Sequence, residues 1–413
     1  MAMKQTQTKL FDFSDVGLDF CAGSKNLFPD RFKKMLSLGY NVQTVTSVAV
    51  VGNQVTFTYG GTHGYAADRV LKVDSGALAS INGGEFWIDS VTTNTVTFTL
   101  DNIPSSIANG FSTRIASLGW ALEYESGQVQ LYKMKYLDER DLYVRLVFPV
   151  AGNTRAAINV CIGKTADIST GVITDPNSIE TGRSNTSITN GFEWALGYQA
   201  TTTYQNYNYA QGLSQFGLGC LVGSKYHVCI MGNNGHAGNY AGFVFGIFPT
   251  SLYKYEKLDY PLLLGAYNTA AITSGGVVQQ LDTLTTFSQA YIGLVAIAMG
   301  PSSSSIQITD TSNSRVVTSF FTDEIEGFNT GSAYPLSIYE KSTKQFLGFV
   351  SAGLYRYDPN YSNSPPNTRA TSPSTITDID LNNIIKMHAA NTGSALTSAV
   401  WFCVPVEEVK IVS

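Results

Sequence analysis

The sequence is poor in charge. Asp, Glu, Lys and Arg make up 14% of its 413 residues, against roughly 25% in an average globular protein. The formal net charge is -5 and the isoelectric point is near 5.4, and basic residues gather only in short runs such as Arg31–Lys34. Because phosphate binding needs clustered Lys and Arg, this composition argues against a nucleic acid as the main partner.

Cysteine and histidine are also scarce, with five and four residues. The cysteines are odd in number and widely spaced, which is not the pattern of a disulfide framework. The opening MAMKQTQTKLFDF lacks the apolar segment of a secretion signal. No run reaches the roughly 18 apolar residues of a membrane-spanning helix. We therefore expect synthesis in a reducing cytoplasm, free and mostly buried thiols, and no membrane insertion.

Sequence motifs for catalysis and for fibres are missing as well. The chain has no G-x-S-x-G, H-E-x-x-H or G-x-x-x-x-G-K-[ST] motif. Asp138, Glu139 and Asp141 cluster beside Arg140, but in a predicted hairpin turn, where a solvated turn is favoured over an acid–base pair. Heptads, collagen triplets and short β-helix periods are absent. We expect no enzyme, no cofactor and no slender fibre.

Aromatic residues, by contrast, are plentiful, at 12% with 23 Tyr and 22 Phe. Ser, Thr, Asn, Gln and Gly replace charged residues as the polar part of the composition. Such a surface carries little charge to repel a neighbour, and tyrosine supplies contact area with few rotatable bonds. The composition fits a protein with extensive subunit interfaces, and equally an ordinary secreted β-protein.

The first part of the chain divides at about residue 41. Residues 1–41 predict an N-terminal arm that ends in a short helix, with Pro29 in its first turn and Gly39 at its end. Residues 42–116 contain six short strands of alternating apolar residues, joined by turns such as Gly52-Asn53. They predict a small β-barrel.

The remaining residues, 117–413, predict a larger β-sandwich or jelly-roll-like body. Many short apolar strands alternate there with Gly, Asn, Ser and Pro turns, so the fold class is all-β with few short helices. Helical periodicity occurs only at 376–389 and at 261–267. Long exposed loops are expected at about 174–190 and 358–375.

The order of motifs within residues 42–116 carries a resemblance. It runs V-x-V-x-G-N-x-V-T-F-T, H-G-Y, R-V-L-K-V, N-G-G-E-F-W-I and finally V-T-T-N-T-V-T-F-T-L. This order resembles a small barrel module that recurs in tail and baseplate proteins of tailed bacteriophages. The resemblance implies a structural role, in which His63 with Gly64 orders a loop and does not catalyse.

Two segments of the body are similar to structural proteins of the same phages. One contains L-Y-V-R-L-V-F and I-N-V-C-I-G-K, and the other joins Trp194 to F-G-I-F-P-T-S-L-Y-K-Y-E-K-L-D-Y. Those relatives carry an acidic residue after the glycine, where this chain has Ile247 and Phe248, so no role of that carboxylate is carried over. The resemblance implies a virion protein made in the host cytoplasm.

Cys220, His227 and Cys229 are the one pattern that suggests a metal. Strand alternation would place His227 and Cys229 on one face. A structural zinc would need a fourth ligand, and no C-x-x-C pair exists. Buried thiols and a core or interface histidine are the favoured interpretation, without a metal.

Three functions remain open at this level. The favoured one is a non-enzymatic component of a phage tail (tail tip, baseplate or collar) that packs against copies of itself and other virion proteins. The alternative is a receptor-binding protein that recognises a host surface glycan, and the third is a capsid decoration protein. The candidates for an interface or glycan contact are the aromatic residues Trp194, Tyr198, Tyr204, Tyr207 and Tyr209.

Overall fold

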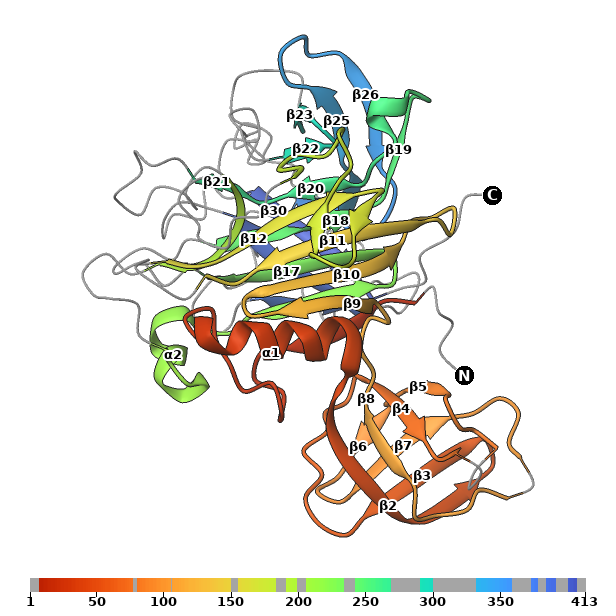
Figure 1. The fold of residues 1–413 in the computed structure, drawn as a ribbon. Coiled ribbons are helices and arrows are strands. Elements are labelled where there is room, and N and C mark those ends of the chain that lie inside the picture. Colours follow the sequence, from red (N-terminus) through yellow and green to blue (C-terminus); the bar gives the residue numbers. More distant parts are fainter. Residues whose placement is uncertain are drawn as a thin grey trace, which may run out of the picture.

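Strands dominate the computed structural model (Figure 1). It describes residues 7–76, 80–104, 106–149, 155–182, 191–198, 206–233, 242–268, 290–299, 332–358, 373–377, 384–390 and 400–406. The sheets are antiparallel and curled, and the two α-helices, α1 (Phe28–Lys33) and α2 (Tyr209–Phe216), are short. The predicted all-β class is confirmed.

The first sheet has seven strands in the order β5-β4-β8-β2-β3-β7-β6. Their bounds are β2 (Tyr40–Val51), β3 (Gln54–Tyr59), β4 (Val70–Asp74), β5 (Glu85–Trp87), β6 (Ser90–Val91), β7 (Thr95–Thr99) and β8 (Ser112–Ile115). β5 pairs with β4, and β6, which follows it closely, pairs with β7. One stretch of chain thus joins both edges of the sheet.

Phenylalanine side chains fill the interior of this sheet. Phe86 stacks on Phe98 with ring centroids 4.8 Å apart, although their strands lie toward opposite ends of the strand order. Phe57 contacts Phe98 and Phe111 edge-on. Alternation along β3 buries Val55, Phe57 and Tyr59 on one face, as the period of two predicts.

The N-terminal segment packs into its own chain. β1 (Lys9–Asp12) pairs with β16 (Cys220–Ser224) as the edge strand of the largest sheet. Phe11, Phe13 and Phe20 are buried. The segment that was predicted as an N-terminal arm therefore contributes its apolar residues to the core of the body.

The helix at the end of this segment follows the sequence prediction. It begins as η1 (Lys25–Leu27), continues through α1 with Pro29 in its first turn, and ends as η2 (Lys34–Leu38). Gly39 follows with a φ of 79°, a backbone angle that suits glycine.

The body consists of larger sheets. The ten-stranded sheet has the order β1-β16-β17-β18-β20-β22-β23-β25-β26-β19. Its further strands are β17 (His227–Asn233), β18 (Gly242–Phe248), β19 (Thr250–Leu252), β20 (Leu262–Leu264), β22 (Ala290–Ile292), β23 (Val295–Ala298), β25 (Ser337–Glu340) and β26 (Phe346–Val350).

A six-stranded and a five-stranded sheet accompany it. The six strands are β21 (Ala266–Asn268), β15 (Gly191–Tyr198), β12 (Arg155–Gly163), β11 (Asp141–Val147), β10 (Val129–Lys135) and β9 (Ala121–Ser126). The five are β24 (Ser332–Pro335), β27 (Tyr355–Asp358), β30 (Val400–Pro405), β29 (Ile384–Ala390) and β28 (Ser374–Thr377). β13 (Ala166–Asp167) and β14 (Val172–Ile173) form a separate short pair.

The middle strands of the ten-stranded sheet are covered on both faces. Every residue of β17 and β18 is buried, as in a strand with protein on each side. β15 of the six-stranded sheet lies against β17, and β29 of the five-stranded sheet lies against β18. His388 Nε2 on β29 contacts the Gly232 carbonyl oxygen on β17 at 2.7 Å. The body is therefore a layered stack of sheets (Figure 1).

The two helices predicted for the body are wrong. Residues 261–267 include β20 and the start of β21, and residues 376–389 include the end of β28 and most of β29. Leu262–Leu264 are almost fully buried in the ten-stranded sheet. Burial between strands overrides the local apolar spacing that suggested a helix.

The two long loops have different outcomes. In the described part of 174–190, Thr174, Pro176, Thr181 and Gly182 are exposed, whereas Asp175 and Ser178 are buried and anchor the stretch. Asp175 accepts a hydrogen bond from Tyr260, and Ser178 donates to the Ile162 carbonyl oxygen. Most of the loop at 358–375 lies outside the described residues.

Candidate binding groove

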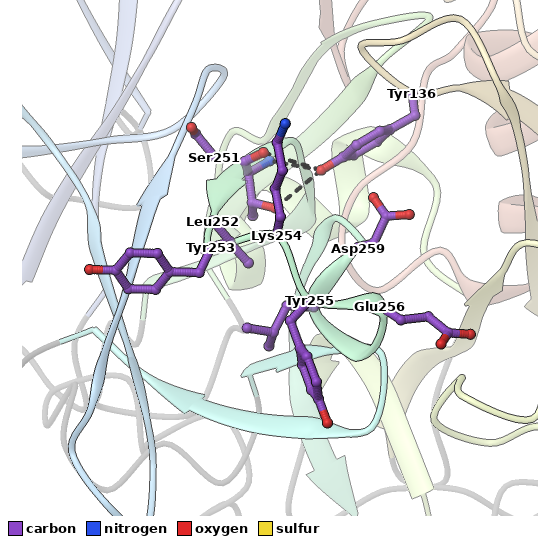
Figure 2. A pocket seen from close by; sticks show the side chains of 10 residues that line it. Tyr136, Ser251, Leu252, Tyr253, Lys254, Tyr255, Glu256 and Asp259 are labelled. Carbon is purple, nitrogen blue, oxygen red and sulfur yellow. Dashed lines mark hydrogen bonds between the residues drawn. The ribbon is translucent and has the colours of Figure 1, made fainter.

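A cavity of about 450 Å³ lies beside β19, where the chain leaves the ten-stranded sheet and turns through η4 (Glu256–Leu258). Its lining consists of Tyr136, just after β10, and most of the segment from Thr250 to Asp259 (Figure 2). The volume lies within the range of about 300–1,000 Å³ that is usual for ligand sites. We call this cavity the groove.

The local sequence explains why this segment leaves the sheet. β19 is the last strand in the sheet order, and it pairs only with β26 in the described residues. The following residues, Tyr253–Lys257, are exposed, whereas Leu258 and Tyr260 are buried. The two buried side chains anchor the end of the turn and leave the residues before them at the surface.

Tyr136 closes one wall of the groove. Its hydroxyl lies 3.1 Å from Thr250 Oγ1 and 3.2 Å from the Thr250 carbonyl oxygen. The Thr250 backbone N–H also donates to this hydroxyl, at 3.3 Å. An edge strand leaves peptide groups without a partner strand. The Tyr136 hydroxyl hydrogen-bonds the backbone of Thr250, which is the first residue of β19 (Figure 2).

Asp259 is a charged residue of the lining and lies near Tyr136, since Arg140 contacts both of them (Figure 2). Arg140 donates to both carboxylate oxygens of Asp259 at 2.5 Å, and Lys164 donates to one of them at 2.9 Å. Burial raises the pKa of this carboxyl, but the hydrogen bonds from Arg140 and Lys164 outweigh burial and leave the pKa below its usual value. Asp259 is thus an ionised, charge-compensated group, which does not suit a general acid.

Tyrosines form the rim. Tyr253 and Tyr255 are 60% and 58% exposed, and their rings point in different directions (Figure 2). Tyr253 meets Phe346 edge-on, with ring centroids 6.4 Å apart. Phe346 in turn contacts Tyr339 at 5.4 Å and Phe349 at 5.1 Å. We call these four residues (Tyr253, Tyr339, Phe346 and Phe349) the aromatic face.

His63 lies in the loop between β3 and β4 of the seven-stranded sheet, and it is not a lining residue of the groove. It is buried, its Nδ1 accepts a hydrogen bond from the Tyr65 backbone N–H at 2.9 Å, and its Nε2 lies 3.1 Å from the Thr95 carbonyl oxygen. Gly64 has a φ of 70°, and a Cβ there would lie 2.9 Å from Val16 Cγ2. These contacts support the loop-ordering role, which stays a prediction.

The suggested metal ligands lie in the core. Cys220, His227 and Cys229 are fully buried, and His227 Nδ1 lies 2.9 Å from Ser224 Oγ. Burial lowers the pKa of His227 to about 3. A Cβ on Gly353 would lie 2.4 Å from His227 Cδ2, so the ring is tightly packed. Among the described residues, no group of three His, Cys, Asp or Glu side chains is placed to hold a metal ion.

The aromatic contact residues predicted from the sequence are not assembled at one surface. Trp194 is 1% exposed, and its Nε1 donates to the Leu264 carbonyl oxygen at 3.0 Å, so it cannot contact a surface ligand in this fold. Tyr207 and Tyr209 are partly buried and pack against the core at α2. Tyr204 and the side chain of Tyr198 lie outside the described residues.

Sequence reasoning missed Tyr253 and Tyr255 as site residues. They belong to the run Y-K-Y-E-K, which alternates aromatic and charged residues between two leucines. Such a run also fits an exposed strand. The sequence alone therefore does not show that these two tyrosines lie in a turn beside a cavity.

Comparisons with known proteins leave the family open. No family model matches the chain, and no curated protein matches it. Among solved structures, the phage phi92 endosialidase aligns over 89% of this chain and 51% of that chain, with 10% identity and a TM-score of 0.14. The chain therefore spans about half the length of that protein. A likeness at this TM-score carries no argument about fold or function.

Among the helices of the described residues, none has both the length and the hydropathy that a bilayer-crossing helix requires.

Proposed function

We propose that this chain is a non-enzymatic structural component of a bacteriophage tail, which acts by packing against copies of itself and other virion proteins. The observation that supports packing best is the aromatic face. Its four rings are contiguous, and Tyr253 and Phe349 are exposed. Clustered exposed aromatic residues are typical of protein interfaces.

The position of the aromatic face favours an intermolecular contact. β19, β25 and β26 lie at one end of the ten-stranded sheet and project beyond the layered sheets (Figure 1). Another protein can reach rings on such a projection without displacing the core. The low charge of the chain reduces repulsion between copies.

The assignment to a phage tail rests on the motif order in residues 42–116. A structural role also agrees with the acidic turn between β10 and β11. There Lys135 pairs with Asp141 at 2.6 Å, Lys225 pairs with Glu139 at 3.0 Å, and Arg140 lies 3.6 Å from Asp138. Each carboxylate has a basic neighbour, as in a solvated turn, and this supports the interpretation without catalysis.

The test is the mass of the purified protein by light scattering over a range of concentrations. We expect a defined oligomer whose mass falls when Phe349→Ser removes an exposed ring of the aromatic face. Val51→Ser is the matched control, because Val51 is 78% exposed on the seven-stranded sheet. A monomeric mass for the unmodified chain at every concentration would contradict self-assembly.

A further inference from the structure

We propose that two buried ion pairs fix the orientation of the seven-stranded sheet relative to the body, so that the two parts act as one rigid unit. Asp15 pairs with Arg69, and Lys9 pairs with Glu85. Asp15 and Lys9 belong to the N-terminal segment, whereas Arg69 directly precedes β4 and Glu85 begins β5. The inference goes beyond the assembly proposal and does not depend on it.

The covalent connection between the two parts is narrow (Figure 1). The chain enters the seven-stranded sheet after Gly39 and leaves it at Ser117, shortly after β8. Ser117 Oγ donates to the Ser37 carbonyl oxygen at 2.8 Å, and the Trp120 backbone N–H donates to the Leu36 carbonyl oxygen at 2.9 Å. The two crossings therefore lie together at the end of η2. By itself one such connection leaves the sheet free to rotate, and relative motion of domains is the usual expectation.

The N-terminal segment, by contrast, is fixed to the body. β1 pairs with β16 along its whole length, and the Phe13 backbone N–H donates to the Gly219 carbonyl oxygen at 2.9 Å. Phe11, Phe13 and Phe20 are buried. A residue of this segment that also contacts the seven-stranded sheet therefore ties that sheet to the body.

The first tie is the pair of Asp15 with Arg69. Arg69 Nε donates to one carboxylate oxygen at 2.7 Å, and Arg69 Nη2 donates to the other at 2.9 Å. The hydroxyl of Tyr40, at the start of β2, donates to the same carboxylate at 2.7 Å, and the Asp12 backbone N–H donates at 3.1 Å. Both side chains of the pair are 10% exposed. Two parallel hydrogen bonds between planar groups set direction as well as distance.

The second tie is the pair of Lys9 with Glu85. Lys9 Nζ lies 2.6 Å from Glu85 Oε2 and donates to the Ser117 carbonyl oxygen at 2.6 Å. The Lys9 side chain is 7% exposed. This ammonium group thus joins β1, the crossing at Ser117 and β5. Together with the covalent connection and the pair at Arg69, it opposes the rotation that the connection alone allows.

Buried charge suits this role because its energy depends steeply on orientation. Replacing a buried ion pair by apolar residues often leaves a protein equally stable, whereas separating the two charges leaves each of them buried without a partner. A rotation of the sheet that breaks either pair therefore carries a large penalty. Apolar contacts are not directional and tolerate small rotations. The two ion pairs therefore select one orientation of the sheet.

The experiment measures the distance between two spin labels, one on each part, by pulsed electron paramagnetic resonance. Val51→Cys carries the label on the seven-stranded sheet, and Ile168→Cys carries it in the turn between β13 and β14. These side chains are 78% and 54% exposed, whereas all five native cysteines are buried and react little with the reagent. An excess of unlabelled chain restricts the measurement to distances within one chain. We expect one narrow distance distribution while both ion pairs are intact.

Two variants test the ion pairs. Glu85→Gln removes one pair, and Asp15→Asn combined with Glu85→Gln removes both. We expect the distance distribution to widen in the first variant and to become about twice as wide in the second, as relative motion of the two parts returns. Glu125→Gln is the matched control, since Glu125 pairs with Lys33 within the body and is more exposed. Its distribution should stay narrow.

Two outcomes would overturn the inference. One is a broad or two-peaked distribution in the chain with both pairs intact, which would show that the sheet swings on its connection. The other is a distribution in Glu85→Gln that is as narrow as that in Glu125→Gln. Circular dichroism shows whether each variant is folded. If the variant without both pairs does not fold, the comparison of Glu85→Gln with Glu125→Gln decides.

Discussion

Trp194 and Tyr255 are large aromatic residues with opposite surroundings. Trp194 lies in β15, inside the stacked sheets, and its Nε1 is hydrogen-bonded to the Leu264 carbonyl oxygen. Tyr255 lies in the turn beyond an edge strand and is 58% exposed. The difference shows that an aromatic-rich composition does not reveal where a binding surface lies, because neighbouring strands decide which rings are covered.

The largest effect on stability is expected when the buried ring of Trp194 is removed. Trp194→Ala should lower the free energy of unfolding by about 3–5 kcal/mol, because it leaves a large cavity. Urea denaturation followed by circular dichroism measures this change. A loss below about 1 kcal/mol would mean that Trp194 is not the packed core residue that its burial indicates.

A buried ion pair extends the comparison to charged residues. Arg69 donates to both oxygens of Asp15, at 2.7 and 2.9 Å, and each side chain is about 10% exposed. Asp15→Ala leaves the Arg69 charge buried, and should cost about 3 kcal/mol of stability. The more exposed pair of Lys33 with Glu125 is the control, since Lys33→Ala should cost less than about 1 kcal/mol. Equal losses of stability in Asp15→Ala and Lys33→Ala would contradict the expectation that a buried ion pair matters more than an exposed one.

Buried histidine should make stability depend on pH. Burial is the main cause that lowers the pKa of His388, to about 4 from 6.5. Between these values the unfolded chain binds a proton that the folded chain does not, so stability falls as the pH falls, by about 1.4 kcal/mol per pH unit. His388→Gln should remove this contribution below pH 6.5. Urea denaturation at a series of pH values measures this contribution. If the free energy of unfolding of His388→Gln depended on pH as steeply as that of the unmodified chain, the prediction would be rejected.

The smallest effect on stability is expected at the exposed ring. Tyr255→Ala should change the free energy of unfolding by less than about 0.5 kcal/mol, as surface substitutions usually do. The same urea denaturation measures it beside Trp194→Ala. A loss of several kcal/mol would show that Tyr255 supports the fold in spite of its exposure.

Some of the fold could be predicted from short stretches of sequence. The alternation in β3, the turn at Gly52-Asn53 and the helix end at Gly39 are all present in the structure. The segments 261–267 and 376–389 were mistaken for helices. Their apolar spacing fits either structure, and burial among other strands made them strands.

The groove could not be predicted in the same way. Tyr136 and Asp259 are separated by more than a hundred residues, and they line one cavity because the Tyr136 side chain reaches Thr250 at the start of β19. The sequence by itself determined the all-β class, since strand alternation and turn preferences act over a few residues. Only the tertiary structure decided that Trp194 is enclosed and Tyr255 is exposed, because burial depends on strands that are distant along the chain.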